Sequence, residues 1–152
     1  MPRHAETREL PYTADQMYAL VADVERYPEF LPWTAAARVR SRERRGAEEV
    51  MLADLVISFK VFRESFGSRV VLHPGERRIE TSYVDGPFKH LRSEWSFADR
   101  PGGGSRVSFW VDFAFRNPLL GRVIGVVFNE AMQRVVAAFE RRARALYGAP
   151  PR

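Results

Sequence analysis

The sequence contains no cysteine, only three histidines, and no run of the roughly 18 apolar residues that a membrane-spanning helix needs. Disulfide bonds and thiolate metal sites are therefore excluded. His4, His73 and His90 lie in three separate segments, and none has a second histidine or a carboxylate at ligand spacing, so no metal site is expected. The polar residues 1–7 lack the apolar segment of a signal peptide, which predicts a cytoplasmic location.

Residue patterns that support catalysis are also scarce. Ser68 follows Gly67 but has no glycine two residues later, so it does not form a nucleophile elbow. The glycines at 102–104 precede a strand-like segment instead of a helix, which excludes a phosphate-binding loop. Asp112 has polar neighbours and is expected to face solvent, whereas an acid–base role for Asp54 stays open. The sequence therefore favours a binding protein over an enzyme.

The positive charge of the chain comes almost entirely from arginine. Lysine and arginine number 24 against 19 acidic residues, which gives a net charge of +5 and a pI of about 10.1, and only Lys60 and Lys89 are lysines. Arginine binds phosphates through a planar fork of donors, so RNA and anionic lipid surfaces are both candidate partners. A genome whose codon usage replaces lysine by arginine explains the same composition, and both interpretations stay open.

A short helix is predicted after a strand-like segment at 3–11. Thr13 is a capping residue and Gln16 follows three positions later, which is the pattern of a capping box. Two prolines in the segment 27–33 then predict a short helix or a tight loop with buried aromatic side chains. Apolar residues recur at helical spacing at Met17, Leu20, Val21 and Val24.

Six further strands are predicted in three pairs that flank turn-forming glycines and prolines. In the last pair the residues alternate between apolar and polar, which indicates an antiparallel sheet with one solvent-exposed face. Leu91, Trp95 and Phe97 share one face of the first of these strands. The predicted strands cover 36–45, 48–58, 63–73, 76–84, 90–98 and 106–116.

One long helix ends the sequence. Asn117 is a good N-cap, Pro118 suits the first helical position, and Gly148 marks the end. A helix of about 30 residues is roughly 45 Å long and must cross the whole width of a sheet. The order of elements predicts one α+β domain over 1–152 with a helix-grip fold, in which a curved antiparallel sheet wraps around the C-terminal helix. Sheet and helix diverge along their length, which predicts a cavity between them.

Aromatic residues make up 12% of the chain, more than a small core requires. Each of them alone is explained by a structural core. As a set they form a lining suited to a flat ring with an apolar tail. The residues expected to face the long helix are Trp95, Phe97, Phe109, Phe113 and Phe115.

Two apolar segments lie outside the regular pattern. The segment 119–128 is apolar almost all round a helix, which indicates either deep burial or a mobile, membrane-touching end. The segment 59–62 is an apolar tip between two strands. We expect the two segments to meet and frame an entrance, with their cations at the level of lipid headgroups. The predicted entrance residues are Phe59, Lys60, Val61, Phe62, Leu119, Arg122 and Val123.

The segment 21–33, with the sequence VADVERYPEFLPW, resembles the signature of the coenzyme Q-binding START-domain family. That family shares a superfamily with polyketide cyclases and includes bacterial ribosome association toxins. The match continues in order through 68–70, 86–91, 95–97, 113–120 and 138–143. Thr34 stands where the family commonly has cysteine, and Ala114 where it often has glutamate. The resemblance implies a START-like fold with a ubiquinone-binding tunnel and a supporting role in respiration.

We therefore expect the chain to bind ubiquinone or a similar polyisoprenoid lipid, without any other cofactor, as a carrier or chaperone at the inner face of the membrane. The alternative is a ribosome-associating translation inhibitor that uses the arginine-rich surface, and a cyclase-type enzyme ranks third. Polar groups such as Ser93, Thr81 or Tyr83 are expected to meet the quinone oxygens. The predicted ligand contacts are Leu31, Trp33, Tyr83, Phe88, Leu91, Ser93, Trp95, Phe97, Phe109, Val111, Phe113, Val127 and Phe128.

Overall fold

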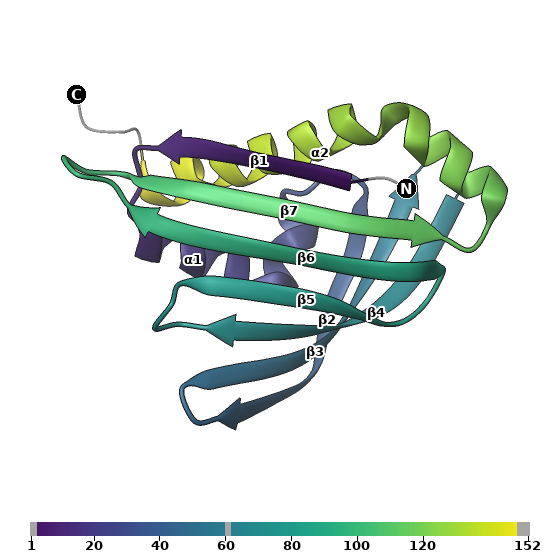
Figure 1. Ribbon diagram of the computed structural model, residues 1–152, viewed down its shortest axis with the longest axis horizontal. Coiled ribbons are helices and arrows are strands. Elements are labelled where there is room, and N and C mark those ends of the chain that lie inside the picture. The colour runs from purple at the N-terminus through teal and green to yellow at the C-terminus, as the bar shows by residue number, and fades with distance from the viewer. Residues whose placement is uncertain (1–2, 60–61, 149–152) are drawn as a thin grey trace.

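Seven strands form one antiparallel sheet that curves around the helices, with strand order β1-β7-β6-β5-β4-β3-β2 (Figure 1). The computed structural model describes residues 3–59 and 62–148, without the side chains of residues 59, 62, 120, 124 and 127–129. The elements are β1 (Arg3–Leu10), α1 (Ala14–Ala22), the 3-10 helix η1 (Val24–Glu29), β2 (Thr34–Arg45), β3 (Glu48–Phe59), β4 (Phe62–His73), β5 (Arg78–Asp85), β6 (Phe88–Asp99), β7 (Ser105–Phe115) and α2 (Pro118–Tyr147). The predicted α+β helix-grip fold is confirmed, and each predicted strand lies within two residues of its observed bounds.

Helix α1 begins where its sequence signature predicts. The backbone N–H of Gln16 donates to the Thr13 hydroxyl at 3.1 Å, and the Gln16 side chain accepts from the Thr13 N–H at 2.9 Å. This reciprocal pair is the predicted capping box. The apolar face of the helix, including Met17 and Val21, is almost fully buried against the sheet.

The outer face of the sheet carries charged residues that pair with one another. Asp112 accepts from Arg3 and interacts with His90, as a solvent-facing carboxylate does. His73 lies 2.8 Å from Glu48 and 3.3 Å from Glu80. The alternation along each strand thus separates a charged outer face from an apolar inner face.

The long helix α2 lies across the inner side of the sheet (Figure 1). Asn117 caps it by accepting from the Leu119 N–H at 2.9 Å, and it ends before Gly148, whose φ of 85° suits glycine. Its C-terminal half buries Phe139 and Ala143, whereas Val126 in its first half is 87% exposed. Within the described part of the chain, no helix combines the length and hydropathy needed to cross a bilayer.

Candidate functional site

A cavity of about 290 Å³ lies between the inner face of the sheet, the η1–β2 segment and α2. Strands β3 to β7 form its floor, because every second residue of each strand points inward. Helix α2 covers it with Ala131, Met132 and Val135. The lining is mainly apolar, and no charged side chain of the described chain contributes to it.

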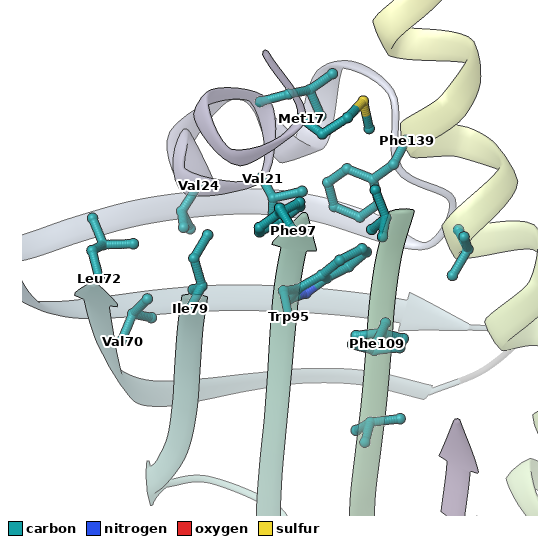
Figure 2. Packing of buried hydrophobic residues seen from close by; sticks show 14 of the residues in the cluster. Met17, Val21, Val24, Val70, Leu72, Ile79, Trp95, Phe97, Phe109 and Phe139 are labelled. Carbon is teal, nitrogen blue, oxygen red and sulfur yellow. The ribbon is translucent and has the colours of Figure 1, made fainter. Parts of the chain in front are cut away.

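One end of the cavity is closed by tightly packed aromatic rings. The ring of Trp95 lies 4.4 Å from Phe109 and 5.0 Å from Phe139, measured between centroids. Phe139 also packs edge-on against Tyr27 at 5.4 Å. Figure 2 shows Phe139 reaching from α2 toward Trp95 on the sheet, next to Met17 of α1. This end is therefore shut by contacts among α1, η1, α2 and the sheet.

A second aromatic group lies at the other end, where β6 begins and β7 ends. Phe88 is its centre, with ring centroids 5.1 Å from Phe66, 5.6 Å from Phe113 and 4.7 Å from Phe115. All four rings line the cavity. Because the chain passes from β7 into α2 here, this end faces the exposed start of the long helix.

The η1–β2 segment supplies the side wall. Burial raises the pKa of Tyr27, and the nearby carboxylate of Asp23 adds to this shift. The Tyr27 hydroxyl donates to the backbone carbonyl of Val21. Trp33 lines the cavity with φ of 60°, a left-handed conformation that costs an aromatic residue about 1 kcal/mol or more. This strain is of the kind that ligand-binding segments retain.

Most of the predicted ligand contacts surround this one cavity, although contact with a ligand itself stays a prediction. Two do not line it. Tyr83 accepts from the Phe88 N–H at 3.2 Å and packs on the Phe88 ring. Phe97 stacks against Trp95 and meets Tyr18 of α1 edge-on. The side chains of Val127 and Phe128 lie outside the described residues. The predicted residues that line the cavity are Leu31, Trp33, Thr81, Phe88, Leu91, Ser93, Trp95, Phe109, Val111 and Phe113.

Much of the cavity wall was not predicted from the sequence. The alternation on β3 and β4 indicates its residues there, and on α2 a spacing of four residues brings Ala131, Val135 and Phe139 to one face. The bend that brings η1 over the sheet has no such periodic signal. The missed lining residues are Val24, Tyr27, Pro32, Thr34, Leu55, Ile57, Phe66, Ser68, Val70, Ile79, Ala131, Met132, Val135 and Phe139.

The predicted entrance is only partly described. Lys60 and Val61 lie outside the described residues, as do the side chains of Phe59 and Phe62. By register, the β3–β4 connection and the start of α2 leave the sheet at the same end, since Phe59 pairs with Phe62, Gly67 with Asp85, and Phe88 with Phe115. Leu119 and Arg122 are exposed and Val123 is half-buried. That these segments frame an entrance stays a prediction.

A second concavity lies on the outer face of the sheet. Its charged side chains form ion pairs with one another: Arg40 lies 2.8 Å from Asp54 and 3.8 Å from Asp85. A side chain at Gly67 would collide with Arg40 and Asp85. Asp54 therefore belongs to an ion-pair network, and the acid–base role left open for it gains no partner among the described residues. Nor do three or more histidine, aspartate or glutamate side chains of the described chain gather as metal ligands.

Fold and cavity together define a START-like helix-grip protein with a mainly apolar interior. A family model described as polyketide cyclase / dehydrase and lipid transport matches residues 10–140, and the chain belongs to this family. A START superfamily protein from Mycobacterium smegmatis has the same fold, with a TM-score of 0.79 at 20% identity over 95% of this chain and 98% of that one. The predicted family resemblance is confirmed.

The relatives of this chain do not all carry the same name. The chain is 35% identical to the ribosome association toxin RatA of Rickettsia prowazekii, over 91% of this chain and 93% of the relative. It is 31% identical to the mitochondrial coenzyme Q-binding protein COQ10 homolog B of Xenopus laevis, over 95% of this chain and 59% of the relative. The solution structure of an 18 kDa protein from Caulobacter crescentus matches with a TM-score of 0.81 and 38% identity, covering 98% and 100% of the two chains.

Proposed function

We propose that this protein binds ubiquinone or a similar polyisoprenoid lipid in the cavity under α2 and carries it without chemical change. The observation that carries the proposal is the lining, which is mainly apolar and contains no charged side chain of the described chain. Catalysis by proton transfer needs a titratable group near the reacting atom, and an uncharged apolar lining favours binding instead. The coenzyme Q-binding name of one relative supports the choice of ligand.

The size of the cavity limits how much of such a ligand is enclosed. Its volume of about 290 Å³ is at the small end of ligand sites, which hold roughly 300–1,000 Å³. A ring and the first part of its tail fill this space. The rest of a long isoprenoid tail then leaves between the second aromatic group and the start of α2, where apolar surface is already exposed at Leu119 and Val126.

We further propose that this exposed start of α2 contacts the membrane from the inner face, as a peripheral and reversible attachment. Leu119 is 60% and Val126 87% exposed, and Arg122 lies between them on the same helix. Apolar side chains next to a cation suit the boundary between acyl chains and anionic headgroups. Contact at this position gives the ligand tail a route that avoids water.

The direct test is mass spectrometry of the lipids extracted from the purified protein, with recovery of a polyisoprenoid quinone expected. The matched variant is Val111→Phe, which adds a ring to the cavity lining and should abolish copurification. Val84→Phe places the same ring at a site 47% exposed and should retain the lipid. An empty parent protein that also fails to take up added quinone would rule out the proposal.

A second function, association with ribosomes, is favoured by the RatA relatives. Among the described residues, the exposed Arg141 and Arg144 of α2 have no ion-pair partner, so they remain free to contact phosphates. The double reversal Arg141→Glu/Arg144→Glu should weaken cosedimentation with ribosomes, and the binding of the parent should fall steeply with salt. Arg45→Glu/Arg106→Glu changes the net charge equally at arginines already paired with Glu43 and Glu9, and serves as the control. Absence of cosedimentation at low salt would remove this function.

A further inference from the structure

Three hydroxyl groups lie together on the otherwise apolar floor of the cavity. Thr81 of β5 and Ser93 of β6 are direct cross-strand partners, and residues in this relation have Cβ atoms about 4.5–5.5 Å apart. On β4, Val70 is the residue that pairs with Thr81. Ser68 lies two residues before Val70 and therefore on the same face of the sheet. All three line the cavity, together with Trp95, which follows Ser93 on the same face of β6.

These polar groups have no hydrogen-bond partner in the part of the chain that the structure describes. That holds for the hydroxyls of Ser68, Thr81 and Ser93 and for the indole N–H of Trp95. Thr34 lines the same cavity, yet its hydroxyl donates to the carbonyl of Pro32 at 3.3 Å. Thr81 and Ser93 are half-buried, and the buried side-chain oxygens without a partner in the described chain are those of Tyr18 and Ser105, so the four groups of this cluster are open to the cavity. In an otherwise apolar lining, such polar groups are the ones that fix the orientation of a ligand.

The chemistry of these groups restricts the ligand. An indole N–H only donates, and hydroxyls donate as well as accept, so the complementary ligand group is an acceptor oxygen. No charged side chain of the described chain lines the cavity, so an ionised carboxylate, phosphate or ammonium would lie there without compensation. The class that fits is an uncharged lipid that carries carbonyl or ether oxygens on a compact head.

We propose that Ser68, Thr81, Ser93 and Trp95 form a head site that binds the oxygens of such a ligand, so that the head lies on the floor of the sheet and the tail runs toward Phe88 and the start of α2. This inference rests on the proposed function and adds the orientation of the ligand and its selection by oxygen. The positions of the aromatic residues along the strands support this orientation of the ligand. Trp95 packs at the closed end with Phe139, and the aromatic group around Phe88 lies at the end where α2 begins.

The test compares three probes with alkyl tails of similar length by calorimetric titration: decylubiquinone, decylbenzene and decanoate at pH 8. The test variant is Ser68→Ala/Thr81→Val/Ser93→Ala, which removes three hydroxyls and hardly changes the shape of the three side chains. Thr7→Val/Ser82→Ala/Ser96→Ala makes the same three changes at residues that do not line the cavity and is the matched control. Thr81→Val alone is a milder variant that keeps the measurement possible if the triple variant folds poorly.

For the parent we expect decylubiquinone to bind more tightly than decylbenzene and decanoate to bind weakest. The triple variant should lose affinity for decylubiquinone on the order of tenfold and keep its affinity for decylbenzene, since only oxygen pairing is removed. The control Thr7→Val/Ser82→Ala/Ser96→Ala should match the parent with every probe. Unchanged quinone affinity in the triple variant, an equal loss with both neutral probes, or decanoate binding as tight as the quinone would each overturn the head site while leaving apolar binding intact. A parent that binds neither neutral probe would instead overturn the proposed function itself.

Discussion

The two halves of α2 meet very different surroundings. In the C-terminal half, Phe139 is 3% exposed and Ala143 0%, and Arg142 donates to Glu29 while its guanidinium lies over the Phe30 ring. In the N-terminal half, Val126 is 87% exposed. Both halves belong to one continuous helix of 30 residues, so the difference comes from what the sheet, α1 and η1 offer beneath each half.

The two halves of α2 therefore differ in how they contribute to stability and to local opening. The closed end concentrates aromatic and apolar contacts, so the folding free energy resides mainly there. Among the described side chains of the first half of α2, none is buried as Phe139 is, and regions with few buried contacts open locally at low free energy. On the proposed function, this difference predicts that a ligand enters past the start of α2 while the closed end stays folded.

The largest expected effect is at the closed end. Phe139→Ala removes a buried ring that packs against Tyr27, Phe30 and Trp95, and should lower the free energy of unfolding by about 3–5 kcal/mol. Val126→Ala at the exposed start should change it by less than about 0.5 kcal/mol. Urea denaturation measures both. Equal effects of the two variants would contradict the proposed difference between the halves.

The next effect concerns the two glycines at the start of α2. A Cβ at Gly121 or Gly125 meets nothing within 4 Å outside the helix itself, so alanine fits at both positions. Each Gly→Ala change should stabilise the helix by about 1 kcal/mol. If opening of this segment admits the ligand, the double variant should also exchange bound quinone more slowly in a stopped-flow transfer assay. Faster exchange together with higher stability would show that entry does not pass this segment.

The fold was largely predictable from sequence because its signals are local and periodic. The capping box at Thr13, the alternation on β6 and β7, and the N-cap at Asn117 each fix an element without reference to the rest of the chain. The cavity was predictable on the same two strands for the same reason. Tyr27 and Phe66 were missed because their place in the wall depends on how η1 and β4 bend over the sheet, which is a tertiary property.

A smaller effect is expected at the membrane. Leu119→Ser/Val126→Ser removes exposed apolar area from the start of α2 and should reduce partitioning onto vesicles with anionic lipid by severalfold. Equilibrium quinone affinity in detergent should hardly change, since neither residue lines the cavity. Leu146→Ser, at an exposed site near the other end of the same helix, is the control. Equal loss of partitioning in the control would place membrane contact elsewhere.

Stability should hardly respond to removal of the head-site hydroxyls. Because the Thr81 hydroxyl has no partner in the described chain, Thr81→Val removes an unpaired polar group and should leave the unliganded protein unchanged or stabilise it by up to about 1 kcal/mol. Thr34→Val breaks a hydrogen bond to Pro32 and should destabilise by a similar amount. Thermal unfolding of both variants decides this. A destabilised Thr81→Val protein would mean that the hydroxyl serves the fold and not a ligand.

The smallest expected effect is a pH dependence that belongs to the closed end. The N–H of Ala14 donates to Asp99 at 3.0 Å and Arg77 donates to it at 2.8 Å, and these contacts lower the pKa of Asp99 despite partial desolvation. A carboxyl whose pKa is lowered on folding stabilises the protein above its unfolded pKa of about 3.9, and this contribution is lost as the pH falls through the lower folded value. The difference in Tm between the parent and Asp99→Asn should therefore be constant above about pH 5 and shrink below about pH 4. Asp15→Asn removes a carboxylate from the same Arg77 without touching the Ala14 N–H, and its curve should follow the parent more closely. If Asp99→Asn and the parent stay parallel down to acid unfolding, the link between α1 and the end of β6 does not depend on this charge.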